Sequence, residues 1–296
     1  MLAKVTKLGF LGLNTVKYDD MVHHYRNVIG LPVAHQSSKE AYFSCGGDRL
    51  AISFHRGDQP GYRHVGLQVA GEGPLDDVAA ELSRGGINAK LKSDLFEGVP
   101  SCVQIDDPDH HSIYLYRSAP FTSTAYQSRG VVPDKLGHVA LFVSDAQQAA
   151  KFYTDVMGFR WSDWLADFFV FLRCNADHHT MNFMKAEKCG LFHVAFELHD
   201  FNHLGKGCDI LAMNGVRIIW GPGRHGMGHN LFLYHRDPDG NVVEFIADLD
   251  RMSDERLGYF DPRHYHADVP QRPKVWLPDD PMAVNSWGAP IPPDLL

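Results

Sequence analysis

The sequence lacks the features that would place it in a membrane, in a secretory compartment or on a nucleic acid. Its five cysteines are scattered, odd in number and free of CxxC spacing, which predicts reduced thiols rather than disulfides or a zinc site. No run approaches the roughly 20 apolar residues of a membrane span, and the first residues lack the apolar core of a signal peptide. The formal net charge of -8, with acids and bases interspersed, argues against nucleic acid and anionic membranes as partners. We therefore expect a cytoplasmic globular protein.

What the 296 residues do contain is 18 histidines and an internal repeat. Four segments begin alike, and each is typical of a short strand. The third is followed by a capping-box pattern at Ser144–Gln147, an amphipathic helix that stops at Gly158, and then three further strands. The repeating unit is therefore βαβββ, used four times. Its four openings are Leu8–Leu13, Arg63–Leu67, Leu136–Leu141 and Phe192–Phe196.

Pairing the units predicts an α+β fold with two barrel-like domains, at residues 1–120 and 130–250. Ser118–Arg129, rich in Ser, Thr, Gly and Ala, is interpreted as the linker. Residues 251–296 form a tail that is too proline-rich for a long helix but carries Trp and Tyr, which disordered segments normally lack. We expect this tail to dock, either at the mouth of the second barrel, where it would exclude water, or at a subunit contact.

The stretch Gly221–Ala247 contains a carboxylate in an unusual place. Asp237–Gly240 has the composition of a tight turn between two strands. On the strand after the turn, Glu244 shares a face with Val242 and Ile246 because side chains alternate with period two. A lone ionised Glu on a buried face would be costly, so it needs a cation.

Alignment of the two predicted domains reveals a functional asymmetry. Only the second has two histidines and a carboxylate on matched strands, which is the facial triad that suits non-haem Fe(II), with Mn(II) also accepted. A lone buried histidine such as His64 is more typical of a hydrogen-bonded core residue. The sister domain thus acts as an internal control. The aligned pairs are Phe10 and His138, His64 and His193, and Tyr114 and Glu244.

These features together resemble the type I extradiol catechol dioxygenases of the vicinal oxygen chelate superfamily, over nearly the whole chain. The resemblance rests on the triad, the Gly221–Gly226 segment, Tyr234 before the turn and the duplicated βαβββ units. It implies a metal-free N-terminal domain and three further site residues. These are a catalytic histidine about fourteen residues before the second ligand, which selects His179 over His178, and the substrate-contacting His225 and Tyr234.

The resemblance also implies the chemistry. A catechol would bind the metal through its adjacent oxygens and O2 would take the third open position, with ring opening next to the two hydroxyls. Tyr234 and His225 would orient the catechol oxygens, and His179 would act as acid and base near O2. Such enzymes act in the degradation of aromatic compounds and are usually homo-oligomers.

Two departures bear on the substrate. Some relatives have an asparagine and an arginine that would bind the carboxylate of a substrate. Here those positions hold Ala140 and, by spacing, Trp220–Gly221. A charged substrate side chain is therefore disfavoured. We expect Phe171 and Met227 near the ring, although the aromatic tract around Phe171 is more typical of ordinary core.

Two alternatives remain at this point. Glyoxalase-like isomerases and epimerases also use βαβββ metal sites, but commonly split their ligands between modules or subunits and use more carboxylates. A non-catalytic module that sequesters aromatic compounds would need no triad and is usually one domain long.

Overall fold

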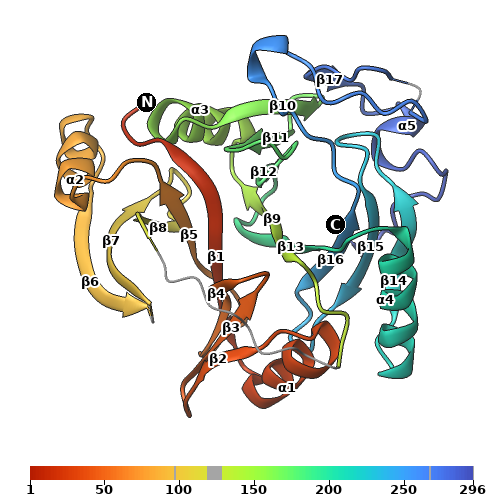
Figure 1. Ribbon diagram of the computed structural model, residues 1–296, viewed down its shortest axis with the longest axis horizontal. Coiled ribbons are helices and arrows are strands. Elements are labelled where there is room, and N and C mark those ends of the chain that lie inside the picture. Colours follow the sequence, from red (N-terminus) through yellow and green to blue (C-terminus); the bar gives the residue numbers. More distant parts are fainter. Residues whose placement is uncertain (97, 119–128, 267, 296) are drawn as a thin grey trace.

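The computed structural model describes residues 1–96, 98–118, 129–266 and 268–295, which form four βαβββ modules (Figure 1). The first two modules build one curled sheet of eight strands, and the last two build a second sheet that a strand of the tail extends to nine. The predicted α+β fold of four modules paired into two barrel-like units is therefore confirmed.

The first sheet has the order β2-β3-β4-β1-β5-β8-β7-β6, so the opening strands of its two modules lie side by side at its centre. These two strands run antiparallel, and each pairs in parallel with the last strand of its own module. The first module comprises β1 (Val5–Thr15), α1 (Tyr18–His23), a π-helical turn η1 (His24–Ile29), β2 (Val33–Gln36), β3 (Glu40–Cys45) and β4 (Asp48–Arg56). The second comprises β5 (Gly61–Val69), α2 (Leu75–Arg84), β6 (Lys90–Phe96), β7 (Val99–Asp106) and β8 (Ser112–Tyr116).

The second sheet repeats this arrangement in the order β14-β15-β16-β13-β9-β12-β11-β10-β17. Its centre is again an antiparallel pair of opening strands flanked by parallel closing strands. The third module comprises β9 (Lys135–Val143), α3 (Ala146–Met157), β10 (Arg160–Leu165), β11 (Phe169–Arg173) and β12 (Met181–Lys185). The fourth comprises β13 (Gly190–Glu197), α4 (Phe201–Met213), β14 (Ile218–Arg224), β15 (Leu231–Arg236) and β16 (Val242–Ala247).

The start of α3 differs by one residue from the capping box expected at Ser144–Gln147. Asp145 is the N-cap, and its carboxylate accepts hydrogen bonds from the N–H groups of Gln147 and Gln148 at 2.8 and 3.1 Å. The N–H of Ser144, one residue outside the helix, donates to Asp109 in the first half of the chain at 3.2 Å. The end of the helix at Gly158, with φ of 73°, is as expected for a left-handed C-cap.

The two halves share one continuous apolar core. Tyr25 of η1 lies at their junction, with its ring 4.5 Å from that of Phe54 in the first sheet and 6.3 Å from that of Phe196 in the second. Its hydroxyl donates to Asp237, at the turn before β16, over 3.3 Å. The predicted linker Ser118–Arg129 lies almost wholly outside the described residues.

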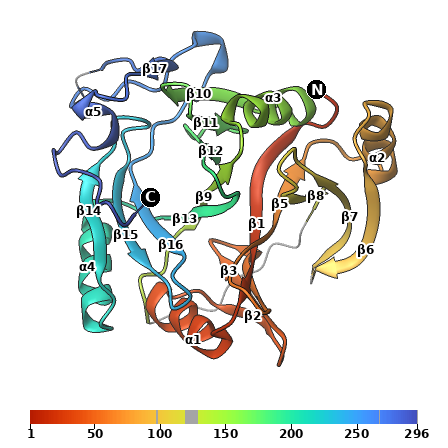
Figure 2. The same ribbon diagram turned by 180° about the vertical axis from the view of Figure 1, so that it is seen from behind.

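The C-terminal tail lies against the second sheet and ends beside β15 and β16 (Figures 1 and 2). The buried side chains of Phe260, Trp276 and Leu295 anchor it. Its last described residues are tied to β15, because Arg236 donates a hydrogen bond to the carbonyl of Asp294. The tail contains the short 3-10 helix η2 (Glu255–Leu257), the strand β17 (Lys274–Trp276), which runs parallel to β10, and the helix α5 (Pro281–Val284).

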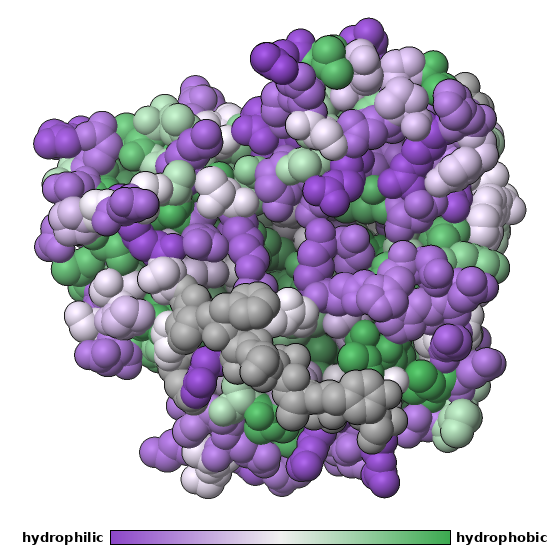
Figure 3. All heavy atoms as spheres, in the orientation of Figure 1, coloured by the Kyte–Doolittle hydropathy of each residue, from purple (hydrophilic) through white to green (hydrophobic). Residues whose placement is uncertain are grey.

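Polar side chains dominate the face shown in Figure 3, where apolar side chains show only in small groups between them. None of the helices in the described residues combines the length and the apolar character needed to span a bilayer.

Candidate metal centre

Three adjacent strands bring the predicted triad together. His138 on β9 and Glu244 on β16 are both register partners of Ala195 on the strand between them, β13. His193 lies two residues before Ala195, and side chains two apart on a strand point to the same face. His138, His193 and Glu244 are thereby directed to one point under the curl of the second sheet.

The three donor atoms lie close enough to share one ion. Nε2 of His138 is 2.9 Å from Nε2 of His193 and 3.0 Å from Oε2 of Glu244, and the third separation is 3.3 Å. Three donors on one face of an octahedron with bonds of about 2.1 Å lie about 3.0 Å apart. The exposed fractions are only 1%, 3% and 1% for His138, His193 and Glu244. The donor set and its geometry therefore fit a divalent iron or manganese ion.

The carboxylate of Glu244 is anionic in this environment. Burial by itself would raise its pKa, but the surrounding imidazoles of His138, His193 and His225 outweigh that effect and hold the pKa well below its usual range. No side chain of the described residues meets its two oxygens with the geometry of a hydrogen bond. Burial lowers the pKa of His193, although Glu244 opposes the shift. The lowered pKa of His193 and the ionised carboxylate of Glu244 favour the deprotonated ligand forms that a divalent ion requires.

His179 lies beside the triad, on the loop before β12. Its ring centroid is 4.4 Å from that of His138, and its side chain is buried. Burial, reinforced by His138 and His178, lowers its pKa well below the usual value, so the ring is neutral. His178, which the sequence set aside, points away to Asp163.

His225 and Tyr234 lie on the other side of Glu244. The Nδ1 atom of His225 faces the carbonyl of Val284 in α5, an acceptor, so Nδ1 carries the proton. Its Nε2 lies 3.1 Å from the hydroxyl of Tyr234 and 3.3 Å from Oε1 of Glu244. Burial, followed by the nearby carboxylate of Glu244, raises the pKa of Tyr234 well above its usual value. Tyr234 is therefore a hydrogen-bond donor at neutral pH.

All six predicted site residues line one cavity of about 220 Å³. Its remaining walls are mainly apolar, and none of the described residues that line it is Lys or Arg. Phe171 and Met227 line it as expected. Phe168 and Phe169, from the tract that is more typical of ordinary core, line the cavity as well. The other lining residues are Leu165, Asn182, Met184, Phe192, Trp220, Pro278, Val284, Ile291 and Leu295.

The sequence reasoning missed Asn182 and the four tail residues in this wall. Asn182 on β12 is the register partner of Ala140, is 1% exposed, and its Oδ1 has no hydrogen-bond partner in the described part of the chain. Its neighbours Met181 and Phe183 belong to the main core. Period-two alternation therefore places Asn182 on the cavity face, a signal that the sequence did contain.

In the first sheet, aromatic side chains and His64 occupy the position that corresponds to the triad. His64 lies 5.8 Å from Phe10 and 5.4 Å from Tyr114 between ring centroids. Burial is the main cause that lowers the pKa of His64 well below its usual value. Although His55 also packs on His64, at 5.7 Å between ring centroids, no three His, Cys, Asp or Glu donors lie close enough here to share an ion in the described part of this half.

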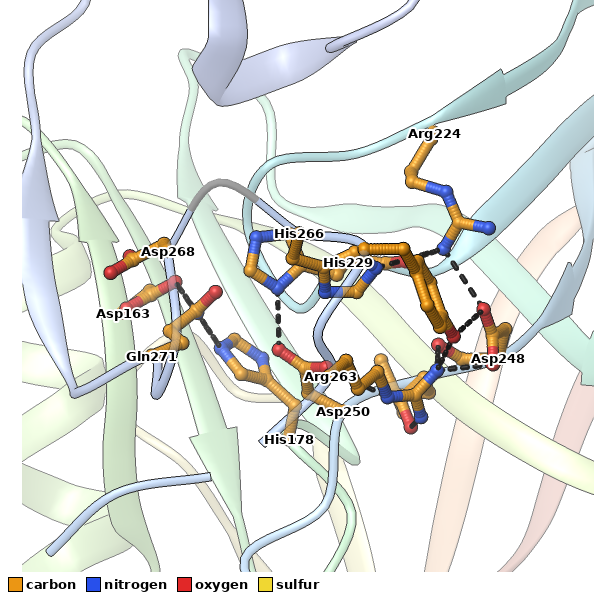
Figure 4. A network of polar contacts seen from close by, with 12 residues as sticks. Asp163, His178, Arg224, His229, Asp248, Asp250, Arg263, His266, Asp268 and Gln271 are labelled. Atoms are coloured by element: carbon orange, nitrogen blue, oxygen red, sulfur yellow. Dashed lines mark hydrogen bonds and ion pairs between the residues drawn. The ribbon is translucent and has the colours of Figure 1, made fainter. Parts of the chain in front are cut away.

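A second group of possible ligands, His229, Asp250 and His266, lies under the tail (Figure 4). His229 Nδ1 is 2.7 Å from Asp250 Oδ2, but Arg263 Nε is 3.3 Å from the other Asp250 oxygen. Arg224 Nη1 lies 3.4 Å from Nε2 of His266. Two guanidinium groups already neutralise this cluster, so a further cation is disfavoured. The network fastens the tail to the loop between β14 and β15.

Known proteins resemble this chain in sequence and in fold. The family model described as Glyoxalase/Bleomycin resistance protein/Dioxygenase superfamily matches residues 135–245. Metapyrocatechase 2 of Cupriavidus necator is 31% identical over 224 residues, which cover 68% of this chain and 69% of the relative. The 3-methylcatechol 2,3-dioxygenase of Pseudomonas putida is 26% identical over 260 residues, covering 81% of this chain and 89% of the relative.

The fold matches solved structures over almost its whole length. The Mn(II)-bound glyoxalase from Novosphingobium aromaticivorans has a TM-score of 0.85 and 27% identity, with 99% of this chain and 94% of that chain covered. Other relatives in sequence are named as iron-dependent or manganese-dependent dioxygenases.

Proposed function

The chain belongs to the type I extradiol dioxygenases of the vicinal oxygen chelate superfamily, and from this membership we infer that it opens the ring of a catechol-type diol beside its two hydroxyls. Both atoms of O2 enter the product, a muconic-semialdehyde-type compound, in the degradation of aromatic compounds. The observation that carries the assignment to a site is the convergence of His138, His193 and Glu244 at the bottom of an otherwise apolar cavity.

We assign these three side chains as the ligands of Fe(II), with Mn(II) as the alternative ion. An ion held by these residues would act as a Lewis acid toward the adjacent oxygens of the diol and toward O2. The fit of the 2.9–3.3 Å donor separations to a facial arrangement supports this assignment.

Tyr234 and His225 hold the oxygens of the diol. The hydroxyl of Tyr234 stays protonated because of its raised pKa, so it can donate to an anionic diol oxygen. His225 is fixed by the Val284 carbonyl, with its Nε2 facing the hydroxyl of Tyr234 and Oε1 of Glu244, so this atom can hold a diol oxygen by a hydrogen bond.

His179 moves protons on the opposite side of the triad. Its neutral imidazole lies against His138 in a site that excludes water, where it can take up a proton and return it to oxygen as the ring opens. The tail closes the cavity with Pro278, Val284, Ile291 and Leu295. We propose that it acts as a lid rather than as a subunit contact of the homo-oligomer that we expect, because these side chains face the cavity.

The substrate is proposed to be a catechol with an uncharged substituent, such as an alkyl or aryl group. A carboxylate on the substrate would be buried against Leu165, Phe168 and Phe192 with no cationic side chain in the described wall to pair with it. Removing a carboxylate from water without a partner costs several kcal/mol. The apolar wall gains from an alkyl group at about 0.8 kcal/mol for each buried CH₂.

The alternative function is that of a glyoxalase-like isomerase, since the Mn(II)-bound structural neighbour is named as a glyoxalase. Such enzymes commonly place more than one carboxylate at their metal site. Glu244 is the one carboxylate among the described lining residues, and the triad already uses it. The cavity therefore favours the dioxygenase.

Ring cleavage is tested by mixing the Fe(II)-loaded protein anaerobically with 4-methylcatechol and then admitting ¹⁸O₂. We expect a yellow product with both oxygen atoms labelled, formed one for one with the O2 consumed. The same assay with 3,4-dihydroxybenzoate should give a kcat/KM lower by at least about 10²-fold, which corresponds to about 3 kcal/mol. A colourless product, or isomerisation of a hemithioacetal without O2, would overturn the proposal.

A further inference from the structure

Asp163 on β10 is a fully buried carboxylate that the proposed mechanism does not use. Its side chain is 0% exposed and lies among four hydrogen-bond donors. Two of them are unambiguous, because an indole nitrogen and a backbone amide can only donate. Its partners are Trp276 Nε1 at 2.9 Å, the Lys274 backbone N–H at 3.1 Å, Gln271 Nε2 at 3.1 Å and His178 Nε2 at 3.2 Å.

His178 connects this carboxylate to the active site. It is 0% exposed, and its Nε2 faces Asp163 (Figure 4), while its Nδ1 lies 3.0 Å from Nδ1 of His179. The chain Asp163, His178, His179 therefore runs without interruption from the tail to the ring that packs on His138.

The carboxylate decides which ring nitrogens carry protons. An unprotonated Nε2 of His178 would point its lone pair at an anionic oxygen, so Nε2 carries the hydrogen and donates to Asp163. Gln271 Nε2 also lies 3.4 Å from this ring nitrogen, but its shorter contact, 3.1 Å, is with the Asp163 oxygen. With its ring hydrogen on Nε2, His178 offers Nδ1 as an acceptor, and Nδ1 of His179 is then the donor across the 3.0 Å contact.

We propose that Asp163 and His178 are positioning residues that hold His179 with Nδ1–H toward His178 and Nε2 unprotonated on the cavity side. This inference rests on the proposed function, in which His179 takes up a proton from the reacting oxygens. Asp163 and His178 lie outside the cavity, yet they direct the basic Nε2 atom of His179 toward the substrate. Because an imidazole linked at Nδ1 cannot rotate freely, they also fix the plane of its ring.

The tail takes part in this arrangement. Trp276 and Lys274 reach Asp163 from β17, which pairs in register with β10, and Gln271 precedes that strand. The tail thus has two contacts with the site. Its residue Leu295 lines the cavity, and its segment around Trp276 orients the carboxylate of Asp163, which in turn orients His178 and His179.

The tautomer can be read directly, without turnover. We suggest labelling the histidine side chains of the full-length protein with ¹⁵N, loading it with diamagnetic Zn(II), and assigning the His179 signals by their loss in His179→Phe. The proposal predicts a protonated, pyrrole-type Nδ1 and an unprotonated, pyridine-type Nε2. The reverse pattern would overturn it. Because this readout needs no ring cleavage, it remains decisive even if the wild-type protein fails to cleave catechols.

Two substitutions at His178 separate positioning from packing. The Oδ1 atom of Asn can replace the Nδ1 acceptor of His178, whereas the Nε2 atom of Gln can replace its donor to Asp163 but leaves His179 without an acceptor. We expect His178→Asn to keep most of the kcat, and His178→Gln to lower kcat by about 10–100-fold with KM close to that of the wild type.

A packing role predicts a different order. If His178 only fills space, the smaller Asn should be the more damaging change, and this result would overturn the proposal. His111→Gln is the matched control, because His111 is also buried and pairs with a buried carboxylate, Asp107, at 2.9 Å, far from the triad in sequence and outside the cavity. It should change stability but leave kcat unchanged.

Discussion

His64 and His193 occupy the same register position in the two sheets but have opposite surroundings. His64 is the partner of Gly12, and His193 is the partner of Ala140. A methyl group at Gly12 would lie 2.3 Å from the His64 ring, so the glycine allows that ring to lie against its neighbouring strand. Ala140 has this methyl group and excludes the same placement, and His193 instead directs Nε2 to His138 at 2.9 Å. In the first half of the molecule aromatic rings thereby occupy this position, and in the second half the same position holds the metal-ligand set.

Replacing His179 by Phe should separate binding from chemistry. The ring keeps its packing against His138, but no atom remains to move a proton. We expect normal iron content and normal anaerobic binding of catechol, with turnover slower by roughly 10²–10⁴-fold. Metal analysis, anaerobic titration and steady-state rates measure the three quantities. Unchanged turnover would assign proton transfer to another group.

Truncation after Pro278 tests the tail as a lid. It removes Val284, Ile291 and Leu295 from the cavity wall, as well as the carbonyl that orients His225. A cut after Leu257 would be less informative, since it also removes Phe260, whose side chain is fully buried. We expect O2 consumption to exceed ring cleavage while the oligomeric state, measured by light scattering, stays the same. Normal coupling together with dissociation into monomers would make the tail an assembly element.

The junction between the two halves should lose stability in acid. His24 lies with its ring centroid 5.6 Å from that of His235, and burial lowers the pKa of His24 from 6.5 to about 4. The unfolded chain therefore binds a proton below pH 6.5 that the folded state refuses until about pH 4. Stability is complete above pH 6.5 and falls as the pH drops through this window.

From pH 7 to pH 5, His24 alone should reduce the free energy of unfolding by about 2 kcal/mol. Urea titrations at both pH values, on wild type and on His24→Leu, measure this contribution. In the variant the loss between the two pH values should be smaller by that amount. Equal losses in both proteins would show that His24 is not a source of the acid sensitivity.

The sequence predicted the parts of the site that obey strand periodicity and repeat register. His138, His193 and Glu244 could be found because each has a counterpart in the first half, and Asn182 could have been found by the alternation along β12. Phe168 and Phe169 could not be assigned to core or cavity, since both environments select the same residue types and only the curl of the sheet decides between them.

Contacts between segments far apart in the chain could not be predicted from the sequence. Nothing in the sequence around Asp163 indicates that Trp276, more than 100 residues later, donates to its carboxylate, because the tail carries no repeat to align. The placement of Leu295 in the cavity likewise depends on how the tail packs, and its apolar side chain alone would suit any buried surface.

The measurement that tests the central claim most directly is the iron content of two single variants, His193→Ala and His64→Ala, reconstituted anaerobically and analysed with the wild type. His64→Ala should be less stable by roughly 2–4 kcal/mol, as for other large-to-small substitutions of buried residues, yet bind one iron per chain. His193→Ala should fold and bind none, because it removes one of three protein ligands. Loss of iron from the folded His64→Ala protein, or its full retention in His193→Ala, would contradict the assignment of a single metal centre to the second half of the chain.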